Sequence, residues 1–427
     1  MTVYTVEIIK IEGTGGDFVL IASTKNAERI SLIARVWPRE TLLQMGKIHG
    51  FYCPVCQAPV HLKTGTKRCW HFAHQPHHAC FVDSEPETSA HLSGKEDLFH
   101  WCDDAGRSPQ LEHYLPELRQ RPDLYLPGIE PAVIEYQCSM IPEEVFASRS
   151  MGYLDAYITP IWVIGINHYH RQWERIRLSG FTSMAIRQSR VSPETHPFSS
   201  RYYVWFYDPS TKVIRCVHGL SPLSKTHFIS QEKSVTLSVC KPYQLISPPQ
   251  KFSPAQFKRY WLEMKKRKRQ AIPYHMTREE YMLRAQTYQL NHYFACYPAF
   301  VGLPHHSFIH LYNPPLLWQM WVYLFMGVIE PKRYVMPRQI IEKAVQRGMG
   351  SLYELRHLPL CPLKTANQLV RIYLEQLIRL GIAEKMDDRY RLVYLPPKDL
   401  VISRLLEDDR RVLERLEETL LSNPIKE

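Results

Sequence analysis

The first half of the chain alternates between amphipathic and apolar segments, and their order predicts a folded core between residues 84 and 167. Glu87, His91 and Lys95 recur every four residues, so they share one face of a helix that runs to about Trp101. Three apolar segments separated by turn residues follow, then a second helix and a continuous apolar segment typical of a strand buried on both faces. This order predicts an α/β (α+β) domain with a mixed sheet. The predicted strands are 110–115, 123–126, 132–138 and 161–166, and the predicted second helix is 142–156.

The flanking segments have other patterns. Short strands with turns are expected over the first fifty residues, and a β-hairpin is expected where two apolar segments flank a turn after residue 200. The apolar segment at 316–329 predicts a buried core helix within a helical region that spans 254–345. Two helices and a two-stranded wing after Met336 predict a winged-helix-like end. The predicted ranges are 18–22 and 30–36 for the first strands, 202–207 and 213–217 for the hairpin, 338–347 and 366–380 for the two helices, 382–385 and 389–393 for the wing, and 399–421 for a last helix.

The segment between Phe51 and Cys80 is rich in Cys and His and poor in large apolar residues, so it needs a staple to fold. Cys53-x-x-Cys56 supplies two thiolates, and His71-x-x-His74, separated from it by fourteen residues, supplies two imidazoles. Two soft thiolates and two imidazoles in a closed tetrahedron suit Zn²⁺. The spacing therefore predicts a structural zinc knuckle with these four ligands. Alternative ligands in the same module are Cys69, His77, His78 and Cys80.

Three domains follow from these patterns. Residues 1–80 form N-terminal strands and the zinc knuckle, and residues 84–250 form the α/β domain, which ends in a Pro-rich linker. Residues 251–427 form a basic, mainly helical C-terminal region with the winged-helix-like end. The 427 residues suit such a division, and their 45% apolar share is typical of a globular protein that buries a core.

Charge is concentrated in the third domain. The formal net charge is +11, and residues 251–300 hold ten Lys or Arg against three Asp or Glu. A basic helix with interleaved aromatics is suited to phosphate backbones and single strands. A solvated helix face is an equally good interpretation, and anionic lipid is a further one. The predicted nucleic-acid-binding residues are Lys258, Arg259, Lys265, Lys266, Arg267, Lys268 and Arg269.

The N-terminal sequence lacks the basic and apolar regions of a secretory signal, and the apolar segment 316–329 is too short to span a bilayer. We therefore expect no transmembrane segment. Ten cysteines without a signal are typical of thiols or metal ligands rather than of a disulfide framework. A cytoplasmic location is expected.

Two carboxylates mark a candidate catalytic site in the α/β domain. Asp123 begins one predicted strand, and Glu135 and Gln137 share a face of the next. Adjacent strands would bring Asp123 and Glu135 within reach of one Mg²⁺, which prefers oxygen ligands. A metal held in this way polarises a phosphodiester and activates its bound water.

These motifs in this order resemble the competence protein CoiA family, and Asp-x(n)-Glu-x-Gln after a helix resembles the PD-(D/E)XK nuclease fold. The resemblance covers about residues 17–167. The motifs that carry it are Cys53-x-x-Cys56, His71-Phe72-Ala73-His74, Glu87-x-x-x-His91-x-x-x-Lys95, Arg121-Pro122-Asp123, Ile134-Glu135-Tyr136-Gln137-Cys138-Ser139, Arg149-x-x-x-Tyr153 and Ile161-Trp162-Val163-Ile164.

By this resemblance, Asp123 and Glu135 would hold Mg²⁺ or Mn²⁺, and Gln137 would stand where the fold usually has a Lys. Gln137 is neutral, so Lys95 would have to reach the site to supply the charge, with His91 and Glu87 as further residues from the same helix. The family acts in natural transformation, which implies incoming DNA, single-stranded or as a recombination intermediate, as substrate and a RecA-type recombinase as partner.

Three hypotheses remain open at the level of the sequence. The first is a Mg²⁺-dependent nuclease, which the retained carboxylates favour. The second is a non-catalytic DNA-binding or recombinase-loading factor on a decayed nuclease fold, which Gln137 favours. The third is a transcription regulator that uses the winged-helix-like end, although the helix at 366–380 carries only two arginines, Arg371 and Arg379.

Overall fold

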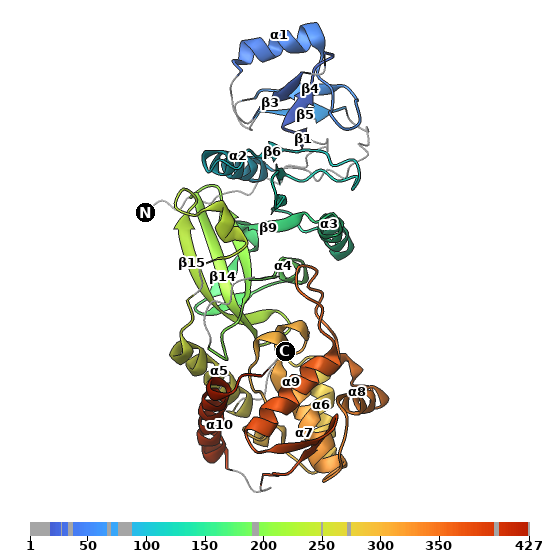
Figure 1. Ribbon diagram of the computed structural model, residues 1–427, viewed down its shortest axis with the longest axis vertical. Coiled ribbons are helices and arrows are strands. Elements are labelled where there is room, and N and C mark those ends of the chain that lie inside the picture. Colours follow the sequence, from blue (N-terminus) through green and yellow to red (C-terminus); the bar gives the residue numbers. More distant parts are fainter. Residues whose placement is uncertain are drawn as a thin grey trace, which may run out of the picture. The chain divides into compact units, whose positions relative to one another are not determined.

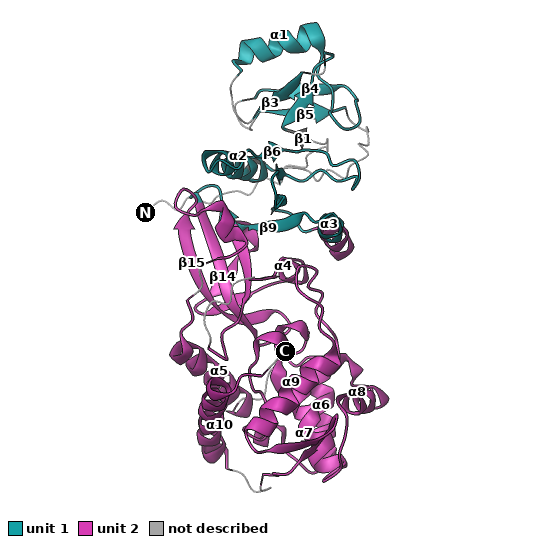
Figure 2. Cartoon of the chain, viewed as in Figure 1, with its two compact units in different colours: residues 1–140, 151–165, 207–212 teal, residues 141–150, 166–206, 213–427 magenta. Residues whose placement is uncertain are grey.

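The computed structural model describes residues 18–26, 28–32, 37–65, 70–75, 88–189, 196–248, 251–270, 275–396 and 401–425. The chain divides into two compact units (Figure 2). Unit 1 comprises Met1–Met140, Met151–Gly165 and Tyr207–Lys212, and unit 2 comprises Ile141–Ser150, Ile166–Phe206 and Val213–Glu427. Glu87 and the four alternative zinc ligands Cys69, His77, His78 and Cys80 lie outside the described residues.

The N-terminal module of unit 1 is built from short strands and one helix (Figure 1). The expected strand at 18–22 is divided into two, each of which pairs with a different partner. The helix is not expected from the sequence, because its inward face buries only Leu42 completely. A small core forms around Phe51 and Phe72. The elements are β1 (Phe18–Val19), β2 (Ile21–Ser23), β3 (Arg29–Ser31), α1 (Arg39–His49), β4 (Val60–Lys63) and β5 (His71–His74), with sheet orders β1-β5-β4 and β2-β3.

The α/β domain has the predicted order of helix, three strands, helix, strand. Strands β6, β7 and β8 are antiparallel neighbours, and β9 joins β8 in parallel after the helical crossover α3. All six residues of β8 are buried, so this strand is covered on both faces. The first strand is shorter than expected because Glu112 has a φ of 45°, which ends the pairing. The elements are α2 (Ser89–Asp104), β6 (Gln110–Leu111), β7 (Leu124–Leu126), β8 (Ala132–Gln137), α3 (Glu143–Asp155) and β9 (Thr159–Gly165).

Unit 2 contains a largely antiparallel set of strands in the order β10-β11-β15-β14-β13. The hairpin expected at 202–217 is present, and its second strand is longer than expected. The long partner strand β15 is not expected from the sequence, because its second half is polar and largely exposed. The elements are β10 (His170–Gln172), β11 (Arg175–Arg177), α4 (Gly180–Met184), β12 (Arg187–Gln188), β13 (Tyr202–Asp208), β14 (Val213–Pro222) and β15 (His227–Thr236).

The helical part of unit 2 surrounds one large apolar core, which includes Trp318, Trp321 and Tyr373. The segment predicted as a buried core helix is confirmed, since every residue of α7 is buried. The helices are α5 (Pro254–Gln270), α6 (Arg278–Gln289), α7 (Pro315–Tyr323), which continues as a π-helix (Leu324–Ile329), α8 (Pro337–Gln346), α9 (Ala366–Arg379) and α10 (Ile402–Ser422). Short 3-10 helices lie at Ile166–His168, Pro242–Leu245, Phe294–Cys296, His306–His310 and Gly350–Tyr353.

The two helices and the wing that were expected after Met336 are present as α8, α9 and the hairpin of β16 (Ala383–Met386) and β17 (Arg389–Leu392). Asp387, with a φ of 55°, forms the tight turn between the two strands together with Asp388. An isolated bridge joins Val335, ahead of α8, to Tyr390 of the hairpin. Whether these elements constitute a winged helix stays a prediction.

Membrane-spanning helices are not found among the helices of the described residues, because none of them is both long and apolar enough to cross a bilayer.

Candidate functional site

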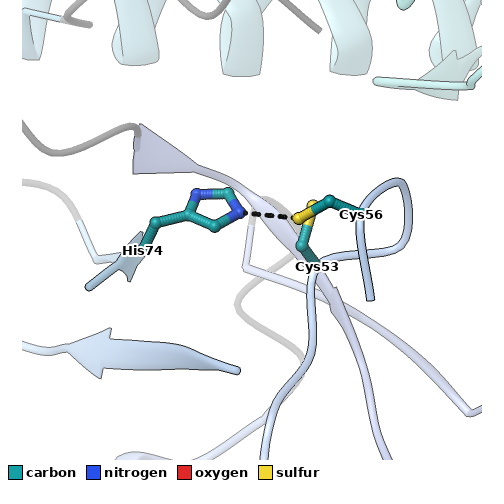
Figure 3. A group of neighbouring side chains, drawn as sticks. All are labelled: Cys53, Cys56 and His74. Atoms are coloured by element: carbon teal, nitrogen blue, oxygen red, sulfur yellow. Dashed lines mark hydrogen bonds between the residues drawn. The ribbon is translucent and has the colours of Figure 1, made fainter. Parts of the chain in front are cut away.

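Three soft donors converge in the N-terminal module (Figure 3). Cys53 and Cys56 come from the turn ahead of β4, and His74 is the last residue of β5. Their sulfur and nitrogen atoms all lie within 4.8 Å of one another, and Cys56 Sγ is 3.4 Å from His74 Nε2. Two thiolates and an imidazole at such distances form three corners of a tetrahedral zinc site. Among the described residues these three therefore fit a zinc ion.

His71 does not join this group, although the sequence predicts it as the fourth ligand. Both histidines lie on β5, and side chains alternate between the two faces of a strand. A separation of three residues therefore directs His71 to the face opposite His74. Among the described residues the converging donors are therefore Cys53, Cys56 and His74, and the full Cys₂His₂ set stays a prediction.

The candidate catalytic site lies where α2 faces β7 and β8. Lys95 from α2 approaches Asp123, which directly precedes β7, with 3.4 Å between Nζ and Oδ1. His91, one turn earlier on α2, places Nε2 3.6 Å from the other carboxylate oxygen, Oδ2. The backbone N–H of Tyr136 donates to the same Oδ2 at 2.8 Å and thereby fixes the Asp123 carboxylate against β8. His91 and Lys95, which the sequence places on one face of this helix, thus both face Asp123.

Glu112 is a member of this site that the sequence does not indicate. Lys95 Nζ lies 2.7 Å from Glu112 Oε1, and both side chains are almost fully buried. The backbone N–H of Leu20, in the N-terminal module, donates to the other oxygen at 3.3 Å. Burial opposes ionisation of this carboxyl, but the charges of Lys95 and Arg121 outweigh burial and lower its pKa. Glu112 has a positive φ of 45°, and no local sequence pattern signals that conformation.

Glu135 and Gln137 lie in the middle and at the end of β8, and both are buried. The hydroxyl of Tyr153, from α3, donates to Glu135 Oε1 at 2.6 Å. Tyr153 therefore positions this carboxylate instead of facing solvent. Gln137 donates from Nε2 to the backbone carbonyl of Ser139 at 3.0 Å. Around Asp123 and Glu135, the described residues form no cluster of three His, Cys, Asp or Glu ligands.

A cavity of about 630 Å³ adjoins Glu112 within unit 1. It lies between the turn that carries the zinc ligands and the segment after β6. Its walls combine aromatic and cationic side chains with neutral ones and one acidic residue. The lining includes Lys25, Arg29, Tyr52, Glu112, His113 and Tyr114.

The basic segment forms α5, but its seven cations do not share one exposed face. Lys265 and Arg269 are buried and both pair with Asp409 of α10, at 2.8 Å and 2.7 Å. Lys265 also donates to the carbonyls of Ala299 and Val301. The reason is geometric. Lys265 and Arg269 are four residues apart, so they lie on the same face of the helix, and this face points inward. The expectation that all seven present a common cationic surface is wrong for these two.

The other five cations of α5 are at least partly accessible, and their ability to bind nucleic acid stays a prediction. Arg259 and Lys266 are exposed. Arg267 pairs with Glu263 one turn earlier, Lys258 pairs with Glu417, and Lys268 pairs with Glu280.

Comparison with known proteins places these features in one family. Residues 34–83 match the N-terminal domain of competence protein CoiA, residues 87–250 match its nuclease-like domain, and residues 257–399 match its C-terminal domain. A segment of 122 residues is 38% identical to the competence protein CoiA of Bacillus subtilis (strain 168), and this segment covers 28% of the chain and 33% of that relative. No solved structure matches the chain significantly. Since the three matched domains follow one another along most of its length, the chain belongs to the competence protein CoiA family.

Proposed function

We propose that the protein processes incoming DNA during natural transformation, with a Mg²⁺-dependent nuclease site at Asp123 and Glu135. The observation that carries this proposal is the approach of Lys95 Nζ to within 3.4 Å of Asp123 Oδ1. The PD-(D/E)XK arrangement that the sequence resembles needs a positive charge beside its carboxylates, and neutral Gln137 cannot supply it. A lysine that enters from α2 supplies the charge from another element.

The arrangement of the two carboxylates supports a metal role. Asp123 is 16% exposed, so one side of this carboxylate is accessible to solvent while Tyr136 and Lys95 hold the other. Glu135 is oriented by Tyr153 and would be the second ligand. A divalent cation at these oxygens would polarise the scissile phosphate and lower the pKa of the attacking water. The cavity beside Glu112 gives phosphate and bases a cationic and aromatic surface close to the site.

A second candidate is a non-catalytic DNA-binding or recombinase-loading factor, with a RecA-type recombinase as partner. One specific observation favours it. Lys95 is 1% exposed and lies closer to Glu112 than to Asp123, so most of its charge is already compensated. In this candidate the Lys95–Glu112 pair is a structural remnant, and the domain is only a binding scaffold.

We also infer that α7, α8, α9 and the β16–β17 hairpin form a winged-helix-like scaffold. The bridge from Val335 to Tyr390 supports this, because it adds a short third strand ahead of α8 to the wing. The tip of the wing is Asp387-Asp388, and α9 carries only Arg371 and Arg379. Acidic charge at the tip opposes contact with phosphate, so a role as a transcription regulator receives no support from this end.

The experiment that decides between the two candidates is DNA cleavage by the full chain. Labelled linear and single-stranded DNA are incubated with Mg²⁺, with Mn²⁺ or with EDTA. If the nuclease proposal is correct, the parent cuts DNA only with a metal, and Asp123→Asn and Glu135→Gln each abolish cleavage. Matched controls are Asp155→Asn and Glu130→Gln, two exposed carboxylates of the same unit, which should cut like the parent.

Two further variants test the source of the positive charge. Lys95→Ala should be as inactive as Glu135→Gln, while Gln137→Lys should add little if Lys95 already serves the site. A gain of activity in Gln137→Lys would instead identify a weakened nuclease. If neither the parent nor Gln137→Lys cuts DNA with either metal, the nuclease proposal is wrong and the scaffold candidate stands.

A further inference from the structure

A β-hairpin with a two-residue turn in unit 2 carries an exposed tryptophan at its tip. Strands β10 and β11 pair so that Gln172 lies opposite Arg175, which leaves Trp173 and Glu174 as the turn. The Trp173 side chain is 83% exposed. Within the described parts of the chain its ring has no aromatic, cation–π or hydrogen-bond partner. So large an apolar ring therefore contributes nothing to the core.

The backbone conformation at this tip is unfavourable for a tryptophan. Trp173 has a φ of 56°, in the left-handed region that glycine or asparagine adopts with little strain. A bulky residue in this region is strained, and burial of its ring does not offset the strain here. Neither turn geometry nor packing accounts for Trp173, and its exposed ring is accessible to another molecule.

Two arginines and two histidines lie on the face of the sheet directly behind the tip. Arg175 and Arg177 are two residues apart on β11, so both point to the same face. His170 and His227 lie opposite Arg177 on the two neighbouring strands and are exposed. The pKa of His227 is lowered, first by partial burial and then by Arg177 and Arg175, which agrees with this clustering. Neither arginine forms an ion pair with any carboxylate of the described residues.

Helix α5 extends this surface with a second aromatic and a further cation. Gln256 Nε2 donates to Glu174 Oε1 at 3.0 Å, which places the start of α5 beside the hairpin tip. One turn later, the guanidinium of Arg259 lies 4.9 Å from the centre of the Tyr260 ring. Burial opposes ionisation of Glu174, but the nearby Tyr260 hydroxyl and the Gln256 amide outweigh burial and lower its pKa. The single acidic side chain of the turn is therefore held toward α5.

We propose that this hairpin surface binds single-stranded DNA, with Trp173 stacked on an unpaired base and Arg175 and Arg177 bound to the neighbouring phosphates. The hairpin surface is defined by His170, Trp173, Arg175, Arg177 and His227. Aromatic rings between cations are the combination that single strands require, because each nucleotide offers a flat base and a negative phosphate. A membrane would instead require more exposed apolar groups around the tip. Ile229, which pairs with Arg175, is buried in the core, and the accessible residues behind the tip are His170, Arg175, Arg177 and His227. The identity of the polymer as DNA rests on the proposed function.

The test measures the affinity of the full chain for a fluorescein-labelled 20-nucleotide oligothymidine by anisotropy over a series of salt concentrations. Trp173→Ala should weaken binding roughly 5- to 150-fold, the range of one lost base stack, without changing the salt dependence. Trp173→Phe should retain most of the affinity, because the ring is kept. Arg175→Gln combined with Arg177→Gln should reduce the log–log salt slope by about 1.4, which is about 0.7 for each lost phosphate contact.

The control is Tyr288→Ala, which removes a 73% exposed aromatic side chain from α6 in the same unit and should bind like the parent. Trp173→Gly separates folding from binding. It should raise the Tm, because the strained position becomes relaxed, while it lowers the affinity as much as Trp173→Ala.

The possible outcomes separate this inference from the proposed function. If the parent binds the oligonucleotide and the Trp173 and arginine variants match it, the hairpin surface is not the binding site, although DNA binding stands. If the parent binds no DNA at all, the proposed function fails together with this inference. An equal loss for duplex DNA in Trp173→Ala would overturn base stacking. Loss of binding only to vesicles containing phosphatidylserine would make the surface a membrane contact and overturn the inference.

Discussion

The buried ion pair of Lys95 and Glu112 dominates the electrostatics of the α/β domain at the scale of single residues. Two opposite charges at 2.7 Å compensate each other, but neither retains enough water to be stable alone. The pair also joins the N-terminal module to α2, since the Leu20 amide donates to the free oxygen of Glu112. Its integrity therefore affects both the fold of unit 1 and the charge that reaches Asp123.

Replacement of Glu112 by Gln should destabilise the protein by about 3–5 kcal/mol, because it leaves the Lys95 ammonium buried without its closest counter-charge. The measurement is the free energy of unfolding in urea at neutral pH. The double variant Lys95→Met with Glu112→Leu should recover much of the loss, since it removes both charges. A single variant as stable as the parent would contradict this account.

The same pair predicts a pH dependence of stability. The pKa of Glu112 is lower in the folded protein than its usual value of 4.5, so the folded state binds this proton less readily than the unfolded chain. The contribution of Glu112 is therefore present above the usual pKa and is lost as the pH falls toward the folded pKa. The parent should lose stability between about pH 5 and pH 3 more steeply than Glu112→Gln does, in urea titrations at each pH.

The sequence predicts the site residues that a regular element presents and misses those that an irregular backbone presents. His91 and Lys95 reach Asp123 because α2 is a regular helix, in which positions four apart share a face. Glu112 and Trp173 depend on left-handed backbone conformations, and a single sequence contains no signal for these in non-glycine residues. His71 is a further case, because residues three apart share a face on a helix but point to opposite faces on a strand.

At the scale of elements, the alternation of side chains along strand β5 leads to a prediction about the zinc ligands. His74→Ala should lose most of the bound zinc, because it removes one of the three converged donors. His71→Ala should keep zinc, because its side chain lies on the other face of the strand. Elemental analysis of both variants after purification is the measurement. Equal zinc loss in both would show that His71 binds the metal after all.

Helix α5 separates structural cations from accessible ones. Lys266→Gln with Arg267→Gln should leave the Tm unchanged and flatten the salt dependence of DNA binding by up to about 1.4 on a log–log plot. Asp409→Asn should leave Lys265 and Arg269 without their carboxylate and destabilise the protein by about 3–5 kcal/mol. Anisotropy and thermal unfolding of the same two variants provide the comparison. Strong destabilisation by the first variant would contradict the division.

Lys265 of α5 gives the protein a second pH dependence of stability, at alkaline pH. Burial lowers its pKa from 10.5 to about 8, and the charge of Asp409 only partly opposes this effect. Between these two values the unfolded chain holds the proton that the folded protein has released, so stability rises with pH. The slope should approach about 1.4 kcal/mol per pH unit in the parent and should be nearly flat in Lys265→Met, measured by urea unfolding.

Elements whose apolar spacing reflects burial are predicted well, and those stabilised mainly by neighbours are not. Helix α7 and strands β8 and β9 follow directly from their continuous apolar segments. Helix α1 buries one residue completely, and the second half of β15 is polar, so the spacing of apolar residues gives little information about either. Strand β15 is stabilised by backbone hydrogen bonds to β14 and β11. The side chains of β15 do not reveal these bonds in the sequence.

At the scale of the whole molecule, the N-terminal module and unit 2 differ in how they are stabilised. The module has a small core around Phe51 and Phe72 beside the three metal donors, whereas unit 2 has a far larger apolar core. A structural zinc can contribute on the order of 10 kcal/mol to the folding of such a small module. Division of the chain into the three domains 1–80, 84–250 and 251–427 stays a prediction, as does the DNA-processing role.

Removal of zinc should therefore affect the two parts unequally. Treatment with a strong chelator should increase amide hydrogen exchange in residues 37–65 and 70–75, while the core helices α7 and α9 stay protected. Hydrogen exchange read by mass spectrometry gives the measurement on the intact chain. Protection that is retained in the module after complete metal removal would show that its small core is sufficient.

The last segment of unit 1, Tyr207–Lys212, has a consequence for how the protein is made. The Tyr207 hydroxyl donates to Asp97 of α2, Lys212 pairs with the same carboxylate, and the Tyr136 hydroxyl of β8 donates to the Tyr207 carbonyl. During synthesis these contacts cannot form until Lys212 has left the ribosome, well after β9 has emerged. At about 5–20 residues per second, the nascent α/β domain spends several seconds without its final segment. Over that interval the growing chain is a natural client for chaperones that bind exposed strands.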